Sequence, residues 1–137
     1  MELWDQQDSF KDALPYGTPS AHDYFIFLQK GVFGSEQERY LRLRAWWAGN
    51  DARREEEAVT PLSDDEIANL DAYAALLDES DENVRIIKAE VMRELCKFEE
   101  AETLLSTPFG EQLSFAATII RNLSVKRIPF VREIFFE

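Results

Sequence analysis

The sequence has little of the chemistry that cross-links or metal sites need, with a single cysteine, Cys96, and a single histidine, His22. One thiol cannot form an intramolecular disulfide, and one Cys with one His cannot build a zinc site of the usual kind. Paired Glu-x-x-His units, which hold di-iron centres in helical bundles, need two histidines. We therefore expect no metal site and a chain suited to a reducing compartment, the cytoplasm.

Clustered glycines and long hydrophobic runs are also missing. The five glycines are dispersed, and none begins a GxGxxG or GxxxxGK run of the kind that holds phosphates. The longest apolar runs, over residues 24–28 and 115–120, fall far short of the roughly 18 residues that a membrane span needs. The first residues have no basic stretch followed by an apolar one, as a secretory signal has. We expect no cofactor and no membrane binding.

Basic residues are scarce, with 15 Lys and Arg against 27 Asp and Glu and a formal net charge of −12. Such a chain repels nucleic acid, so we expect a protein partner, neutral or basic. The excess lies in residues 56–102, which hold fifteen acids and four bases. The densest acidic run is a candidate partner-binding surface, although a solvated loop with a helix N-cap is the more usual interpretation of such a run. This run contains Asp78, Glu79, Asp81 and Glu82.

Helical periodicity dominates the chain, of which 45% is hydrophobic and 12% aromatic. We predict an all-α fold of five to seven helices, either an irregular bundle or a degenerate helix-turn-helix repeat. An irregular segment, 1–18, is expected before a single helical domain over 19–137. Capping boxes at Ser35 and Ser63 and a cap at Asp81 or Ser80 mark helix starts, while Gly31, Gly49-Asn50 and Pro108 mark ends.

The apolar positions predict which side of each helix is buried. In the helix after Asp81 we expect Val84, Ile87, Val91 and Leu95 to be buried. The charged residues of the same helix are expected to face water: Arg85, Lys88, Glu90, Arg93 and Glu94. Adjacent tryptophans point about 100° apart on a helix, so one of Trp46 and Trp47 should enter the core and the other lie at its margin.

The stretch NVRIIKAEVMRELCKFEEAETLLSTP, residues 83–108, resembles a tetratricopeptide helix-turn-helix. The resemblance rests on Ala89, on Met92 three positions later, and on Phe98 and Ala101 around the turn. It implies that Ala89 and Ala101 let two helices approach closely and that Phe98 fills the space between them. Cys96 stands where the family usually has glycine, and Arg85 where it often has a large apolar residue. The resemblance implies a scaffold or adaptor that binds proteins.

Catalytic constellations are not evident. His22 beside Asp23 resembles an oriented base, but no nucleophile accompanies it, and an ordinary surface or half-buried histidine is the better interpretation. Cys96, next to Lys97 in a tight turn, is expected to be a small buried residue. Arg39, Arg42, Arg44, Arg53 and Arg54 form the one basic concentration, and nearby glutamates favour internal ion pairs over nucleic-acid binding. We therefore expect no catalytic residue and no enzyme.

The C-terminal residues 128–136 contain six large apolar side chains in nine positions and fit either a helix or a strand. We expect these side chains either to close the core or to contact a partner, which is another protein or a second copy of the chain. The candidate contact residues are Phe130, Phe135 and Phe136. The sequence as a whole predicts a non-catalytic intracellular interaction module. The alternative is an acidic inhibitor, immunity protein or nucleic-acid mimic that covers the basic cleft of a nuclease or toxin.

Overall fold

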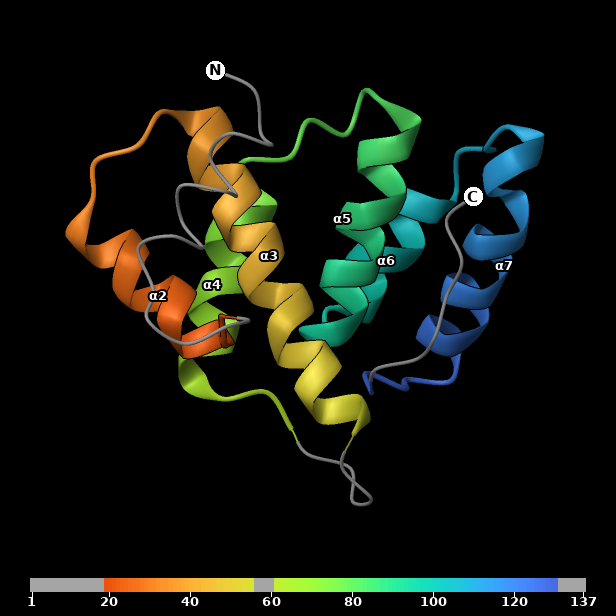
Figure 1. The fold of residues 1–137 in the computed structure, drawn as a ribbon. Coiled ribbons are helices and arrows are strands. Elements are labelled where there is room, and N and C mark those ends of the chain that lie inside the picture. Colours follow the sequence, from red (N-terminus) through yellow and green to blue (C-terminus); the bar gives the residue numbers. More distant parts are fainter. Residues whose placement is uncertain (1–18, 56–60, 131–137) are drawn as a thin grey trace. The chain divides into compact units, whose positions relative to one another are not determined.

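The computed structural model describes residues 19–55 and 61–130, and every regular element in these ranges is a helix (Figure 1). This confirms the all-α fold and its five to seven helices. The six helices are α2 (Ala21–Lys30), α3 (Ser35–Arg54), α4 (Asp64–Ala75), α5 (Glu82–Glu94), α6 (Phe98–Leu105) and α7 (Glu111–Val125). The predicted irregular segment 1–18 lies outside the described residues.

The chain divides into two compact units, Met1–Tyr73 and Ala74–Glu137. The first unit contains α2, α3 and nearly all of α4, and the second contains α5, α6 and α7. The single helical domain over 19–137 stays a prediction, whose signature is one cooperative unfolding transition observed by every probe.

Serine capping boxes begin two helices of the first unit, and the sequence predicts the one at Ser63. Before α2, the Ser20 hydroxyl oxygen accepts a hydrogen bond from Asp23 N at 3.2 Å, and the Asp23 carboxylate accepts one from Ser20 N at 2.9 Å. Before α4, Ser63 and Glu66 bond each other in the same way, at 3.2 and 3.0 Å. Each reciprocal pair satisfies N–H groups that have no partner inside the helix.

The capping box predicted at Ser35 is wrong by one residue. Gly34 is the N-cap of α3, and its N–H donates to Gln37 Oε1 at 3.3 Å, so Ser35 is the first helical residue. Two side chains here have the spacing to accept a hydrogen bond from the backbone N–H of an N-cap residue. Gln37 lies three residues after Gly34, and Glu38 lies three residues after Ser35. Glu38 is instead occupied by Arg42, whose Nε lies 2.7 Å from Glu38 Oε2, which leaves the reciprocal bond to Gln37.

Helix α3 also continues past Gly49-Asn50, where we expected it to stop. The Arg53 guanidinium donates back to the Gly49 carbonyl at 3.3 Å and to Asn50 Oδ1 at 3.2 Å, and it reaches Glu66 of α4 at 2.6 Å. A Cβ at Gly49 would lie 2.5 Å from Glu66 Oε2. The glycine therefore leaves room for the Glu66 carboxylate and does not end the helix.

The Glu66 carboxylate is held in its ionised form by this contact. Burial alone would raise its pKa, but hydrogen bonds from Arg53 and from the Ser63 N–H and the positive charge of Arg53 outweigh burial. The pKa of Glu66 therefore lies below the ordinary value of a glutamate. The ion pair joins α3 to α4 across thirteen residues of sequence.

The first unit has a core of aromatic and small side chains. Tyr24 of α2 packs with Leu41 and Ala45 of α3, and all three are buried. Trp46 is buried at 7% exposure and its ring centroid lies 6.0 Å from that of Tyr73, whereas Trp47 is 45% exposed. The prediction that one tryptophan enters the core is confirmed. Burial raises the pKa of the Tyr73 hydroxyl to about 12, although Arg39 acts in the opposite direction.

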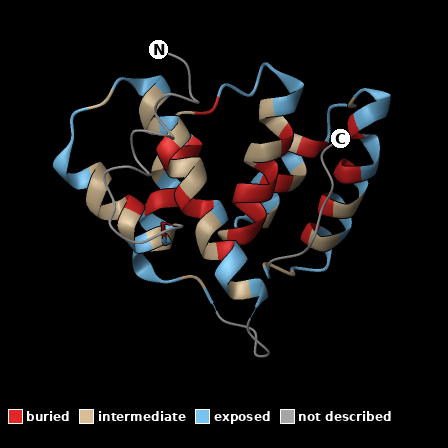
Figure 2. Ribbon diagram, in the orientation of Figure 1, coloured by how far each residue is buried: buried red, intermediate tan, exposed pale blue. Residues whose placement is uncertain are grey.

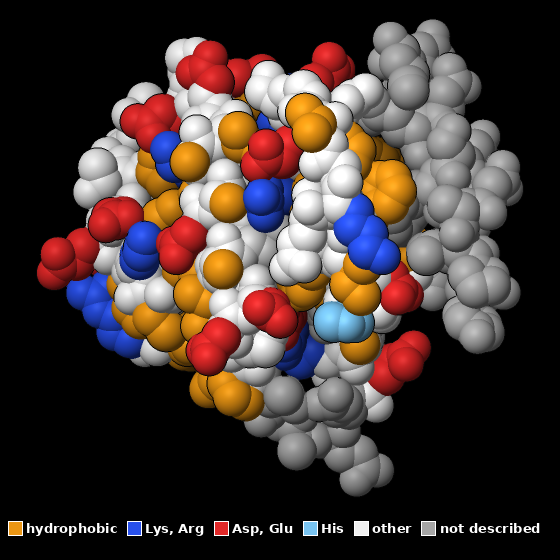
Figure 3. All heavy atoms as spheres, turned by 90° about the vertical axis from the view of Figure 1, so that its left-hand side faces the viewer, with side chains coloured by type: hydrophobic (Ala, Val, Ile, Leu, Met, Phe, Trp, Pro, Cys, Tyr) orange, Lys and Arg blue, Asp and Glu red, His pale blue; other side chains and the backbone are white. Residues whose placement is uncertain are grey.

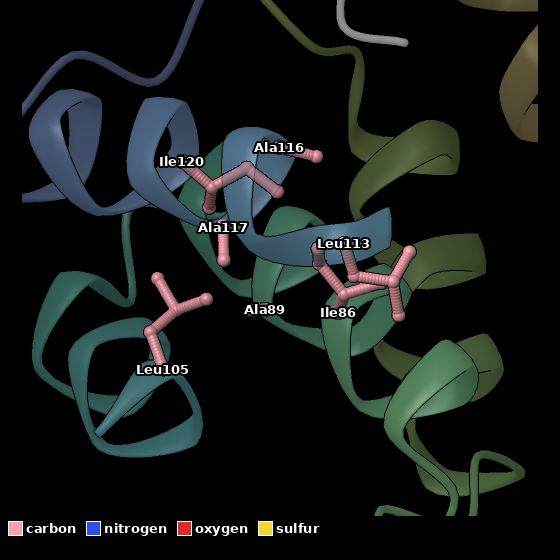
Figure 4. Packing of buried hydrophobic residues seen from close by; sticks show 7 residues of the cluster. All are labelled: Ile86, Ala89, Leu105, Leu113, Ala116, Ala117 and Ile120. Carbon is pink, nitrogen blue, oxygen red and sulfur yellow. The ribbon is translucent and has the colours of Figure 1, made fainter. Parts of the chain in front are cut away.

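In the second unit, α5, α6 and α7 pack around one apolar cluster (Figure 4). Its side chains come from all three helices and are almost fully buried, which Figure 2 shows in red on the three ribbons. Several are alanines, which let helix backbones approach closely because they add little volume at the contact. The cluster contains Ile86, Ala89, Leu105, Leu113, Ala116, Ala117 and Ile120.

The buried side of α5 differs from the predicted one. Val91 is fully buried, but Val84, Ile87 and Leu95 are only half-buried. Ile86, which lies between the expected apolar positions, is 1% exposed and joins the cluster. Helix α5 has neighbours on more than one side, since both α6 and α7 contact it, and a single stripe of apolar residues cannot cover both.

Three charged residues of α5 are also buried, contrary to expectation. Glu90 and Glu94 are each 4% exposed and Arg93 is 0% exposed. Arg93 and Glu90 are paired inside the unit: the Arg93 Nε and Nη2 lie 2.5 and 2.8 Å from the Glu90 carboxylate oxygens. Its Nη1 donates to the carbonyls of Ile128 and Phe130 at 2.7 and 2.8 Å. Burial of a charge is tolerated when such bonds replace water.

Arg85 holds the C-terminal end of α6. Its Nη1 donates to the carbonyls of Leu104 and Thr107 at 2.9 and 2.8 Å, and its Nη2 donates to the Pro108 carbonyl at 3.2 Å. The guanidinium also lies 3.9 Å from the centroid of the Phe109 ring. The last carbonyls of a helix lack partners inside it, so an arginine here satisfies groups that a large apolar residue would leave bare.

The turn from α5 to α6 is a Schellman motif centred on Cys96. Lys97 N donates to the Met92 carbonyl at 2.8 Å and Cys96 N to the Arg93 carbonyl at 3.0 Å, while Cys96 has φ 63°. Backbone bonds hold the motif together without a buried side chain, and Cys96 is exposed. The expectation of a buried cysteine is therefore wrong.

Replacing Cys96 by glycine is expected to raise the free energy of unfolding by about 0.5–1 kcal/mol. The left-handed backbone costs a residue with a Cβ more than it costs glycine, although glycine also gains freedom in the unfolded chain. Urea denaturation measures the change, and Cys96→Ala, which keeps the Cβ, is the control. A glycine variant no more stable than the alanine variant would show that the turn carries no strain at this position.

Candidate functional site

The acidic run predicted as a partner-binding surface lies before and at the start of α5, and all four of its carboxylates are exposed. Asp78 accepts a hydrogen bond from Ser80 N at 3.0 Å, which lowers the pKa of Asp78 below its ordinary value. Glu79 pairs with Lys88 at 3.0 Å. These contacts show that the run shapes the loop in addition to presenting charge.

The other two acids organise helix starts. Asp81 is the N-cap of α5 and accepts from Asn83 N at 2.8 Å, while Glu82 accepts from Gly110 N at 3.1 Å. The second bond brings the start of α7, where Glu111 is exposed, to the start of α5. We call the five exposed carboxylates at this point the acidic end of the second unit: Asp78, Glu79, Asp81, Glu82 and Glu111.

Helix α7 presents an apolar surface that sequence reasoning missed. Phe115 is 67% exposed and Val125 is 57% exposed, although the opposite side of α7 is buried in the cluster. The large apolar side chains that are exposed in the described part of the second unit all lie on α7 or just after it. We define the outer α7 face by residues spaced three and four apart, Phe115, Thr118, Ile119, Asn122 and Val125.

A signal for this face is present in the sequence. Residues 115–120 look like one hydrophobic run, but a helix turns by about 100° per residue, so adjacent residues of the run must face different directions. The small pair Ala116-Ala117 marks the packed side, and Phe115 then falls outside it. Residues 112–130 also hold three bases and no acid, so this stretch differs in charge from the acidic end.

Of the C-terminal candidates, the structure describes only Phe130, which is 43% exposed. Phe135 and Phe136 lie outside the described residues, as does most of the segment that fitted either a helix or a strand. Arg93 holds the backbone leading to this segment through the carbonyls of Ile128 and Phe130.

The residues that carry the family resemblance lie together in the α5–α6 hairpin. Ala89 and Ala101 are both 0% exposed, and Met92 is 5% exposed. Phe98 is half-buried, and the guanidinium of Arg127 lies 5.4 Å from its ring centroid. The two alanines therefore occupy tightly packed positions, whereas the Phe98 ring is partly open to solvent.

The basic concentration on α3 is mostly engaged in ion pairs within the first unit. Arg42 pairs with Glu38, Arg53 with Glu66 and Arg54 with Asp51, at 2.7, 2.6 and 3.0 Å. On the face of the molecule that Figure 3 shows, acidic and basic side chains are interspersed, with hydrophobic ones between them. The internal pairing that the neighbouring glutamates predict is therefore present, with partners from a wider stretch of the chain.

His22 is exposed near the start of α2. In the described ranges, no group of three or more His, Cys, Asp or Glu side chains is arranged to hold a metal ion. None of the described helices is long and apolar enough to cross a bilayer. Comparison with protein-family models, with curated proteins and with solved structures finds no match to this chain.

Proposed function

We propose that the chain is a non-catalytic, cytoplasmic protein-interaction module of tetratricopeptide-like character, which holds a helical segment of a partner protein on the outer α7 face. The observation that carries the proposal is the 67% exposure of Phe115 on a helix whose opposite side is buried. An amphipathic helix laid along another helix anchors itself through such side chains at three- and four-residue spacing. The fully buried Ala89 and Ala101 support the repeat-like character.

Charge specifies the partner further. Lys126 follows Val125 at the C-terminal end of the outer α7 face, and residues 112–130 hold no acid, so the segment that binds there is expected to present apolar residues with an acid at that end. Apolar burial supplies the affinity, at about 25 cal/mol per Å² of apolar surface removed from water, and charge pairs at the rim add orientation. Such a complex should depend only weakly on salt.

A second candidate function rests on the acidic end. Five exposed carboxylates lie at one end of the second unit, and a surface of one sign accelerates association with a basic partner. Under this alternative the chain is an acidic inhibitor, an immunity protein or a nucleic-acid mimic that covers the basic cleft of a nuclease or toxin. Its binding should weaken steeply as ionic strength rises.

Affinity capture from native lysate at low and high salt separates the two functions. We expect a partner that stays bound at high salt, is lost with Phe115→Asp and is retained with Val32→Asp, an exposed apolar residue elsewhere. Loss of the partner at high salt and with Asp78→Asn plus Glu79→Gln would favour the acidic inhibitor instead. Thermal unfolding of each variant shows that the fold is intact, and turnover of a substrate by the pure chain would contradict both functions.

A further inference from the structure

A pocket of about 470 Å³ lies between the N-terminal turn of α2 and the C-terminal half of α3, within the first unit. This volume is in the range of small-molecule sites, about 300–1,000 Å³. The rings of Tyr24, Trp47 and His22 and the side chain of Arg44 are among its walls. In Figure 3 the histidine, in pale blue, lies at the surface beside hydrophobic side chains. Aromatic walls with one cation are typical of ligand pockets.

Arg44 is the side chain that sets this pocket apart. Its Nε is buried and has no hydrogen-bond partner, and it is the one such side-chain atom among the described residues. Its guanidinium carbon lies 5.8 Å from the Trp47 ring centroid. The Nε is closed to solvent, so a ligand in the pocket would reach Arg44 through the terminal nitrogens of its guanidinium.

The carboxylates of the pocket leave Arg44 without an ion pair in the described part of the chain. Asp51 is engaged by Arg54 at 3.0 Å, and Glu55 is exposed at the C-cap of α3. The Ser20 hydroxyl already accepts the Asp23 N–H in the capping box of α2. The positive charge of Arg44 is therefore available to a ligand that carries its own acceptor oxygens.

We infer that this pocket binds a small aromatic carboxylate. A carboxylate accepts two parallel hydrogen bonds from the fork of an arginine, and this pairing is stronger than one with a neutral acceptor. The ring of the ligand would pack against Trp47 and Tyr24, in the offset or edge-to-face arrangements that aromatic pairs prefer. This inference concerns the first unit and does not depend on the outer α7 face.

Titration of the full-length ¹⁵N-labelled chain with benzoate tests the site. We expect saturable shifts of the backbone amides of His22, Trp47, Ala48 and Ala52, with a dissociation constant of about 1 mM for so small a fragment. Benzamide, which has the same ring without the charge, should bind at least about fivefold more weakly. Arg44→Gln should weaken benzoate binding by at least about fivefold, whereas Arg39→Gln, an exposed arginine of the same helix, should change it less than about twofold.

Three results would overturn the inference: no saturation by benzoate, shifts confined to residues outside the pocket, or equal binding by wild type and Arg44→Gln. The dispersion of the amide spectrum shows whether each variant is folded. If Arg44→Gln does not fold, the comparison of benzoate with benzamide on the wild-type chain decides, because equal affinities would exclude recognition of the carboxylate.

Discussion

Replacing Arg93 with methionine is expected to lower the free energy of unfolding of the second unit by about 3–5 kcal/mol, the usual cost of breaking a buried ion pair by removing one partner. Methionine keeps much of the aliphatic volume but none of the donors. Glu90, which is 4% exposed, would then keep a buried charge without its guanidinium partner. The carbonyls of Ile128 and Phe130 would lose their hydrogen bonds from Arg93 in the same step.

The size of this effect follows from how completely Arg93 is bonded. Burial alone would lower the pKa of Arg93, but the hydrogen bonds and negative charge of Glu90 and the nearby charge of Glu94 raise it. The guanidinium is therefore charged at every pH at which the protein is folded. Lysine would keep the charge but cannot reach one carboxylate and two carbonyls with a planar fork, so Arg93→Lys should also destabilise the unit.

Urea denaturation of Arg93→Met, Glu90→Gln and the double variant measures the coupling. In the double variant a neutral amide replaces the buried carboxylate, and we expect this variant to be less destabilised than the sum of the single variants, by about 1 kcal/mol or more. Strictly additive effects would mean that the pair does not interact in solution. An unchanged midpoint for Arg93→Met would contradict the burial of this residue.

Replacing Ile120 with alanine is expected to destabilise the second unit by about 2–5 kcal/mol. Ile120 is 0% exposed and lies in the cluster shared by α5, α6 and α7, so its truncation removes apolar burial and leaves a cavity. Phe115→Ala on the same helix is the control. Because Phe115 is 67% exposed, its loss should change the free energy of unfolding by no more than about 0.5 kcal/mol.

Chemical denaturation of the two variants also tests the orientation of α7. If Phe115→Ala proves as destabilising as Ile120→Ala, the side of α7 that we describe as outer is buried in solution. The proposal that this side binds a partner would then fail as well. A large effect at Ile120 with a small one at Phe115 leaves Phe115 free to act in binding without a role in the fold.

The sequence predicted the helices well where the signal was local. Ser63 and Glu66 bond each other as their spacing indicates, because a capping box involves only residues within one turn. Gly49 misled the prediction because a glycine in a helix is typical of both a stop and a close contact. Only the position of Glu66, from the next helix, shows that the second applies.

For the candidate sites too, some features were predictable from neighbouring residues and others depended on distant ones. The exposure of the acids at 78–82 was predictable, because four carboxylates in five positions cannot all be buried. Their bonds to Gly110 and Lys88 were not, since both partners lie in other parts of the chain. The i,i+3 spacing of Glu90 and Arg93 is visible in the sequence, but the burial of that pair and the unsatisfied Nε of Arg44 are not.

The amino-acid sequence by itself determined that this chain is helical, where most of its helices begin, and that its acids gather in one stretch, because these properties depend on residues within a few positions of one another. The tertiary structure decided which sides of those helices are buried. It placed charged residues of α5 inside and an aromatic residue of α7 outside, since burial depends on which distant segments come to cover a side chain and whether they offer it hydrogen-bond partners.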